Sequence, residues 1–237
     1  MSIQEAHNWL NSANAIAVLT GAGMSADSGI PTFRDAGGLW KQFRPEDLAT
    51  PAAFARHPEL VWDWYHWRRE LIAHAKPHAG HLALVELQRR APGFTLITQN
   101  VDGLHQASGS GSVLEVHGSI WKLRCTQCFR SWSDRTVPAQ GIPRCLCGGL
   151  ARPGVVWFGE SLPPAVWRDA ENAAEDCDVL LVVGTSGSVY PAAGLVAMAK
   201  SAGARTIEVN TEGTVLSPLM DCSLQGSSGE ILPLLLR

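Results

Sequence analysis

The sequence predicts an α/β fold, built on a Rossmann-like, doubly wound parallel sheet with two insertions. Four short apolar runs, each ending in glycine or polar residues, have the form of buried parallel strands: 15–23, 94–100, 179–186 and 205–210. Helical patterns with apolar residues three and four positions apart, such as 79–91 and 192–204, lie between them. This alternation favours a parallel sheet with ligand sites at the carboxyl ends of its strands.

Two segments interrupt the alternation of strand and helix. One is rich in tryptophan and helical in pattern, and the other holds four cysteines. We therefore expect a sheet domain made of residues 1–35, 79–118 and 154–237, a helical insertion over 36–78 and a small cysteine-bearing module over 119–153.

The composition limits which classes of protein are possible. With 237 residues, 46% of them hydrophobic, the chain can fill a substantial core. A formal net charge of −3 gives no basic face for a duplex, so we expect no nucleic acid contact. The amino terminus lacks a basic region ahead of an apolar core, and no run approaches the roughly 18 apolar residues of a membrane span. We expect a cytoplasmic protein without a membrane partner.

Four of the six cysteines form a cluster in the sequence. Cys125 and Cys128 have two residues between them, and after sixteen residues Cys145 and Cys147 follow with one residue between them. Two close pairs of thiolates suit one tetrahedral Zn2+ with every position filled, and a closed site is structural. A disulfide pair or a redox C-x-x-C motif is the alternative, although a reducing cytosol argues against disulfides. The isolated Cys177 and Cys222 are expected to be buried.

The stretch "GAGMSA", Gly21 to Ala26, follows the first predicted strand. It matches the Gly-x-Gly-x-x-Gly/Ala fingerprint, in which missing side chains let the backbone approach a pyrophosphate, and a plain structural turn is the alternative. A dehydrogenase would next show a strand ending in an acidic residue about twenty positions on. Here the glycine-rich "GIPTFRDAGGLWKQF" follows instead, which favours a dinucleotide site without hydride transfer.

Six motifs occur in one order along the chain: "GAGMSADSGIPTFR", "TQNVDGLH", "EVHGS", "CTQC" with "CLC", "RPGVVWFGE" and "GTSGSVYP". Together they resemble the sirtuins, the NAD-dependent protein-lysine deacylases, from about Ala15 to Pro233. The resemblance implies that NAD is a co-substrate bound between the sheet domain and a smaller zinc-bearing domain. The partner would be an acylated lysine of a substrate protein, and the products nicotinamide and 2′-O-acyl-ADP-ribose.

The resemblance also implies three catalytic residues. His117 matches the general base that acts on the ribose hydroxyls of NAD, a role suited to a pKa of about 6.5. Asn100 and Asp102 match residues that hold the nicotinamide ribose and the nicotinamide carboxamide. Taken singly, a histidine at a strand end is more often structural, and an Asn and an Asp two apart often form a turn or a cap.

Further matches concern the rest of the NAD site and the peptide. The implied cofactor-binding residues are Gly21, Ala22, Gly23, Ile30, Arg34, Gln99, Gly184, Thr185, Ser186, Asn210 and Ser228, in addition to Asn100 and Asp102. In the family the peptide binds by strand addition between two loops, which match 156–160 and 187–189 here. The substrate contacts expected from these loops are Val156, Phe158, Gly159 and Val189.

One segment indicates which acyl group is removed. "LATPAAFARHPELVWDWYHWRRE" resembles the desuccinylase branch, in which Tyr65 and Arg68 face the acyl end and a small residue, Ala49, leaves room. Their spacing places Tyr65 and Arg68 on one helical face, where phenol and guanidinium could hold one carboxylate. The alternative is that Arg68 and Arg69 form a solvated basic face.

Three functional hypotheses follow. The first is an NAD-dependent lysine deacylase acting on succinyl, malonyl or glutaryl groups and on acetyl. The second is an ADP-ribosyltransferase or NAD hydrolase using the same cleft. The third is a non-catalytic reader of ADP-ribose or acyl-lysine, which would have no need of His117, Asn100 and Asp102 together.

Overall fold

The computed structural model describes residues 2–33, 38–39 and 44–237. Its main feature is a six-stranded parallel sheet with the order β3-β2-β1-β7-β8-β9. The strands are β1 (Ala15–Thr20), β2 (Gly93–Thr98), β3 (Val113–Glu115), β7 (Val179–Val183), β8 (Arg205–Asn210) and β9 (Cys222–Gln225). Counted along the chain this is the doubly wound order 3-2-1-4-5-6, and it reverses between β1 and β7. The predicted fold class is therefore confirmed.

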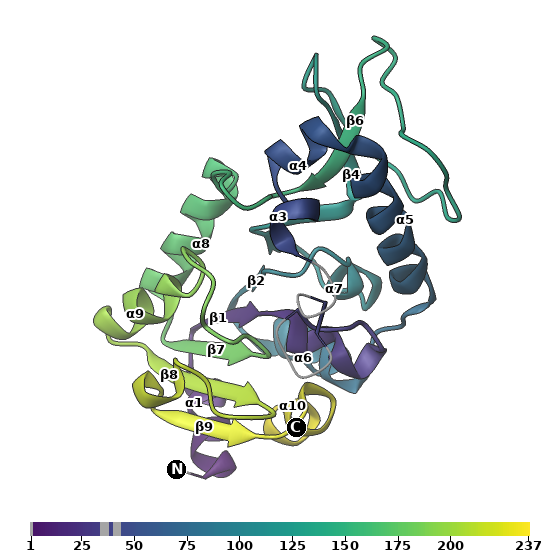
Figure 1. Ribbon diagram of the computed structural model, residues 1–237. Helices are drawn as coiled ribbons and strands as arrows, with labels where there is room; N and C mark the ends of the chain where they lie inside the picture. Colours follow the sequence, from purple (N-terminus) through teal and green to yellow (C-terminus); the bar gives the residue numbers. More distant parts are fainter. Residues whose placement is uncertain (1, 34–37, 40–43) are drawn as a thin grey trace.

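Helices cover both faces of this sheet (Figure 1). On one face lie α1 (Ile3–Ser12), α6 (Ala79–Arg90) and α10 (Ser228–Leu235), and on the other α8 (Pro164–Asp176) and α9 (Gly194–Ser201). β1 shows why: Ile16 and Val18 point into the first core, whereas Ala17 and Leu19 point into the second. A strand buried on both faces is uniformly apolar, which explains why the sequence signal was clear.

A second, antiparallel sheet with the order β5-β4-β6 stands apart from the first. It consists of β4 (Gly118–Cys125), β5 (Ser131–Ser133) and β6 (Ala151–Val155). Beside it lie α3 (Pro45–Leu48), α4 (Pro51–Arg56) and α5 (Pro58–His74), and these helices share one apolar core with β4 and β6 (Figure 1). The helical and cysteine-bearing insertions therefore pack on each other, while their exact boundaries stay a prediction.

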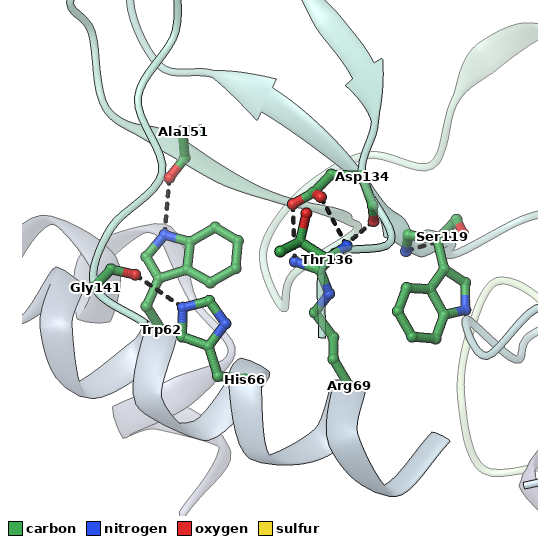
Figure 2. Close-up of polar contacts among 9 residues, drawn as sticks. Trp62, His66, Arg69, Ser119, Asp134, Thr136, Gly141 and Ala151 are labelled. Carbon is green, nitrogen blue, oxygen red and sulfur yellow. Dashed lines mark hydrogen bonds and ion pairs between the residues drawn. The ribbon is translucent and has the colours of Figure 1, made fainter. Parts of the chain in front are cut away.

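Helix α5 is fastened to the loops of the cysteine-bearing module by three side chains on one helical face (Figure 2). Trp62 Nε1 donates to the carbonyl of Ala151 at 2.8 Å. His66 Nε2 lies 2.8 Å from the carbonyl oxygen of Gly141. The third is Arg69, which donates to both the carboxylate and the main-chain carbonyl of Asp134.

Shorter elements connect these layers. They are η1 (Ala22–Ser28), α7 (Leu104–Ala107) and η2 (Ser217–Leu219). Cys177 and Cys222 are buried, as predicted, and each packs into a core of the parallel sheet. None of the described helices has the length and apolar character needed to cross a bilayer.

Candidate active site

A cavity of about 630 Å3 lies where the strand order reverses, and it extends from the parallel sheet to α5 and the loop after β6. That is where a doubly wound sheet binds its ligands. All predicted catalytic, cofactor-binding and substrate-binding residues that lie in the described part of the chain line this cavity. They are Gly21, Ala22, Gly23, Ile30, Ala49, Tyr65, Arg68, Gln99, Asn100, Asp102, His117, Val156, Phe158, Gly159, Gly184, Thr185, Ser186, Val189, Asn210 and Ser228. Arg34 lies outside the described residues.

Two glycine turns meet at the floor of this cavity. Gly23 donates its N–H to the carbonyl of Gly184 at 2.8 Å, and a Cβ added to Gly23 would lie only 2.8 Å from the Cα of Gly184. Gly184 itself has a φ of +60°, and a Cβ there would lie 2.3 Å from the Met24 nitrogen. The glycines that suggested a phosphate turn are thus required by the close contact of the loops after β1 and β7.

The candidate nicotinamide end is a buried polar network at the end of β2. Asn100 Nδ2 donates to the carbonyl of Gly21 and to the hydroxyl of Ser25, at 2.9 and 3.1 Å. That hydroxyl donates to Asp102 Oδ2 at 2.8 Å, and Asp102 Oδ1 accepts from Leu104 N–H at 2.8 Å. Burial raises the pKa of Asp102, and these two hydrogen bonds oppose it. Ser25, which links the pair, lies in the glycine motif but was not predicted.

His117 follows β3 and lines the cavity. Its Nδ1 lies 3.1 Å from the carbonyl oxygen of Gln99. Because a carbonyl only accepts, Nδ1 carries the proton, and in the neutral ring Nε2 is left with a lone pair. Burial lowers the pKa of His117, and the bond to Gln99 opposes that effect. The neutral ring is therefore the dominant form at pH 7, as a general base requires.

A second set of hydrogen bonds in the cavity is organised around Thr185. Gln99 Nε2 donates to the Thr185 hydroxyl at 2.9 Å, and Asn210 Nδ2 donates to its carbonyl at 3.0 Å. The loop that follows Asn210 also lines the cavity, which the sequence did not reveal. Buried Glu208 fastens this loop through the hydroxyls of Thr214 and Ser217.

The residues predicted to form an acyl pocket lie together as a cluster. The guanidinium of Arg68 lies 4.8 to 5.9 Å from the ring centroids of Trp64, Phe33 and Tyr65, and the cluster lies beside Ala49 in the cavity. Arg68 is only 7% exposed. Within residues 2–33, 38–39 and 44–237, no carboxylate lies within 4 Å of it and no hydrogen bond to it is formed. Burial lowers its pKa, and the nearby Tyr65 and the charge of Asp102 oppose that effect.

The alternative of a solvated basic face is wrong. Arg69 is even more buried than Arg68, at 1% exposure, and pairs with Asp134 at 3.2 Å. The two arginines thus leave neighbouring faces of α5 in different directions. Arg69 goes to the interface with the cysteine-bearing module and Arg68 to the cavity.

The loop expected to bind a peptide uses much of its own backbone internally. Val156 N–H donates to the carbonyl of His117, and Phe158 N–H donates to the carbonyl of Ala49. Trp157 N–H donates to the Glu160 carboxylate at 2.8 Å. A strand added here would therefore rely on carbonyl oxygens of this loop as acceptors.

The four clustered cysteines lie together at the tip of the small module. Their Sγ atoms all lie within 4.8 Å of one another, and three pairs are 3.5 to 3.6 Å apart. A tetrahedron of thiolates around Zn2+, with Zn–S distances of about 2.3 Å, spaces its sulfurs by about 3.8 Å, so the donor set fits that ion. A disulfide requires about 2.05 Å, and all six cysteines are free. The disulfide alternative is therefore wrong for this structure.

Fold and site together define a class: a doubly wound nucleotide-binding protein with a thiolate-bound metal module over its cleft. The comparisons make that class specific. The Sir2 family model matches residues 21–191, and the chain belongs to this family. An NAD-dependent protein deacylase 2 of Pyrobaculum aerophilum is 53% identical over 229 residues, which cover 96% of this chain and 92% of that protein. An NAD-dependent protein deacylase of Aquifex aeolicus is 55% identical over 208 residues, covering 87% of each chain.

Solved structures agree with this assignment. A Sir2 homologue in complex with NAD superposes with a TM-score of 0.94 at 47% identity, covering 99% of this chain and 92% of that one. A Sir2 protein in complex with a p53 peptide and NAD+ gives a TM-score of 0.88 at 30% identity, covering 98% and 96%. The sequence-based recognition of the family is confirmed.

Proposed function

We propose that this protein is an NAD-dependent protein-lysine deacylase that removes carboxylate-terminated acyl groups, such as succinyl and malonyl, as well as acetyl. Membership of the Sir2 family and relatives named as deacylases support the general reaction. The buried, unpaired Arg68 beside the cavity supports the acyl preference. NAD supplies the ribose to which the acyl group is transferred, with nicotinamide as the leaving group.

The residues of the cavity suit positioning and one proton transfer. Asn100 and Asp102, fixed by Ser25, would hold the nicotinamide riboside end in one orientation. His117, which lines the cavity and has a lone pair on Nε2, would take a proton from a ribose hydroxyl. The four thiolates would hold Zn2+ in a closed shell without an open coordination position, so that the metal stabilises the small module.

The acyl preference follows from the cost of leaving a charge unpaired. The charge of Asp102 acts on Arg68 only from a distance, and no carboxylate of the described residues contacts the guanidinium. A buried guanidinium without a carboxylate in contact is unfavourable, and a carboxylate brought by the substrate would pair with it. A charge-assisted hydrogen bond contributes about 1.5 to 3 kcal/mol, and about 1.4 kcal/mol is a factor of ten. Arg68 together with Tyr65 could thus favour succinyl over acetyl by two decades or more. A neutral acetyl group would still fit, because the catalytic residues do not contact the acyl tail.

The test uses one lysine peptide in acetylated and succinylated forms, followed by mass spectrometry with and without NAD. We expect faster NAD-dependent loss of succinyl with formation of O-succinyl-ADP-ribose, and no turnover by His117→Ala. Arg68→Met should lower kcat/KM for the succinyl peptide at least tenfold more than for the acetyl peptide, by about one lost charge-assisted bond. Arg56→Met, an exposed arginine of the same insertion, is the matched control and should change neither.

Each alternative has its own outcome. Equal losses on both peptides in Arg68→Met would refute the acyl pocket but keep the deacylase. NAD consumption with neither peptide altered would instead indicate an ADP-ribosyltransferase or NAD hydrolase. Binding of ADP-ribose without turnover would indicate a reader.

A further inference from the structure

A hydrogen bond between two buried aromatic side chains determines whether the Tyr65 hydroxyl acts as a donor in the proposed acyl pocket. Trp157 Nε1 lies 2.9 Å from the hydroxyl oxygen of Tyr65, and each residue is 2% exposed. An indole N–H can only donate, so the Tyr65 oxygen must be the acceptor in this bond. The direction of the bond is therefore settled by chemistry alone.

The proton of the Tyr65 hydroxyl takes no part in the bond with Trp157. A phenol has one proton, and across the described parts of the chain the bond from Trp157 is the one hydrogen bond that the hydroxyl makes. Burial raises the pKa of Tyr65, so the phenol stays protonated. Tyr65 and Arg68 both line the cavity, and the free proton can find an acceptor there. A buried donor without an acceptor is costly, which favours a ligand that supplies one.

Trp157 is itself held firmly. Its main-chain N–H donates to Glu160, and that carboxylate accepts two hydrogen bonds from Arg152, at 2.6 and 2.8 Å. The Arg152 guanidinium lies 3.5 Å from the indole centroid, and Phe54 packs 5.4 Å from the same ring. A cation over the π face draws electron density from the indole and strengthens its N–H as a donor. The orientation of Trp157 is thus set before any substrate arrives.

We propose that Trp157 is a positioning residue for acyl selectivity: by occupying the oxygen of Tyr65, it makes that hydroxyl a donor which joins Arg68 in holding an acyl carboxylate. The inference rests on the proposed deacylase function and assigns a specificity role to a residue that acts through the Tyr65 hydroxyl. An acetyl group offers no acceptor at that depth, so it gains nothing from the arrangement.

The experiment is a double-mutant cycle with the full-length protein at saturating NAD. kcat and KM are measured on the succinyl and acetyl peptides for the wild type, Trp157→Phe, Tyr65→Phe and the double variant. Trp157→Phe should lower the succinyl-to-acetyl ratio of kcat/KM about three- to tenfold, mainly through a higher KM for the succinyl peptide. In the Tyr65→Phe background the same substitution should change the ratio less than about twofold, because no hydroxyl remains to be oriented.

Two further variants separate this role from general packing. Phe54→Leu loosens the same indole but leaves the hydrogen bond, so the ratio should stay at the wild-type value. Arg152→Met removes the cation over the indole ring and should lower the succinyl-to-acetyl ratio, as Trp157→Phe does. If Trp157→Phe does not fold, Arg152→Met takes its place as the test of the inference. Equal losses of kcat/KM on both peptides in Trp157→Phe would overturn this inference, and so would an undiminished effect of that substitution in the Tyr65→Phe background. Either result would leave the proposed acyl preference in place. A wild type without succinyl preference would overturn the proposed acyl preference and this inference with it.

Discussion

Replacing Asp134 should destabilise the protein strongly, because it leaves a buried charge uncompensated. Arg69 is 1% exposed, and Asp134 supplies its one carboxylate partner among the residues that the structure describes (Figure 2). Breaking a buried ion pair costs about 3 to 5 kcal/mol. Asp134 is 18% exposed, and Arg69 would keep the main-chain carbonyl and the Trp121 ring 5.3 Å away. We therefore expect Asp134→Ala to lower the free energy of unfolding by about 2 to 3 kcal/mol, below that range.

The measurement is urea unfolding followed by tryptophan fluorescence. The double variant Arg69→Met/Asp134→Ala removes both charges and should recover part of the loss, since an apolar pair of similar volume replaces the ion pair at little cost. Asp47→Ala is the matched control, because the Arg44–Asp47 pair is solvent-exposed and should contribute little. A loss below about 1 kcal/mol, or a double variant less stable than Asp134→Ala, would refute this account of the interface.

Two further predictions concern histidines and cysteines away from the cavity. Burial lowers the pKa of His81 to about 2 and that of His105 to about 4, so below pH 6.5 the unfolded chain binds protons that the folded chain does not. Stability should therefore fall as pH drops from 6.5, by about 1.4 kcal/mol per unit and per histidine down to about pH 4, and His81→Gln should halve the slope in urea unfolding. An unchanged slope would contradict this. Removing zinc with a chelator should release one ion per chain, lower Tm and make four thiols reactive toward Ellman's reagent. Cys177 and Cys222 should stay unreactive because both are buried, and burial raises the pKa of Cys177 to about 11. Six reactive thiols would mean global unfolding, and four reactive thiols before chelation would exclude a metal.

The sequence predicted the sheet well because its strands are buried on both faces. The run that begins at Ala15 is apolar up to Leu19, and it forms β1 with both neighbours in register. The predicted strand 94–100 extends two residues beyond β2, which ends at Thr98. Asn100 leaves the sheet because its side chain bonds to the turn after β1, and local pattern holds no information about such a distant partner.

The missed features are pairs of residues far apart in the chain. Trp157 is 92 positions from Tyr65, and Asp134 is 65 from Arg69. Each of these side chains taken alone reads as a core aromatic or a surface charge, and their roles arise from tertiary placement. β9 was missed for another reason, since it is a four-residue edge strand with two polar residues and gives a weak periodic signal.

The position of α5 links stability to the proposed acyl selectivity. One face of this helix carries Arg69 into the interface with the cysteine-bearing module, and the neighbouring face carries Tyr65 and Arg68 into the cavity. Because a helix moves as a rigid unit, loosening the first face should displace the second. Asp134→Ala, assayed well below its unfolding temperature, should therefore raise KM for the succinyl peptide and leave KM for NAD unchanged, since the network around Asn100 is fixed to the other sheet. A higher KM for both the succinyl peptide and NAD would show instead that the whole cleft depends on the interface between α5 and the cysteine-bearing module. The acyl selectivity could then not be separated from that interface.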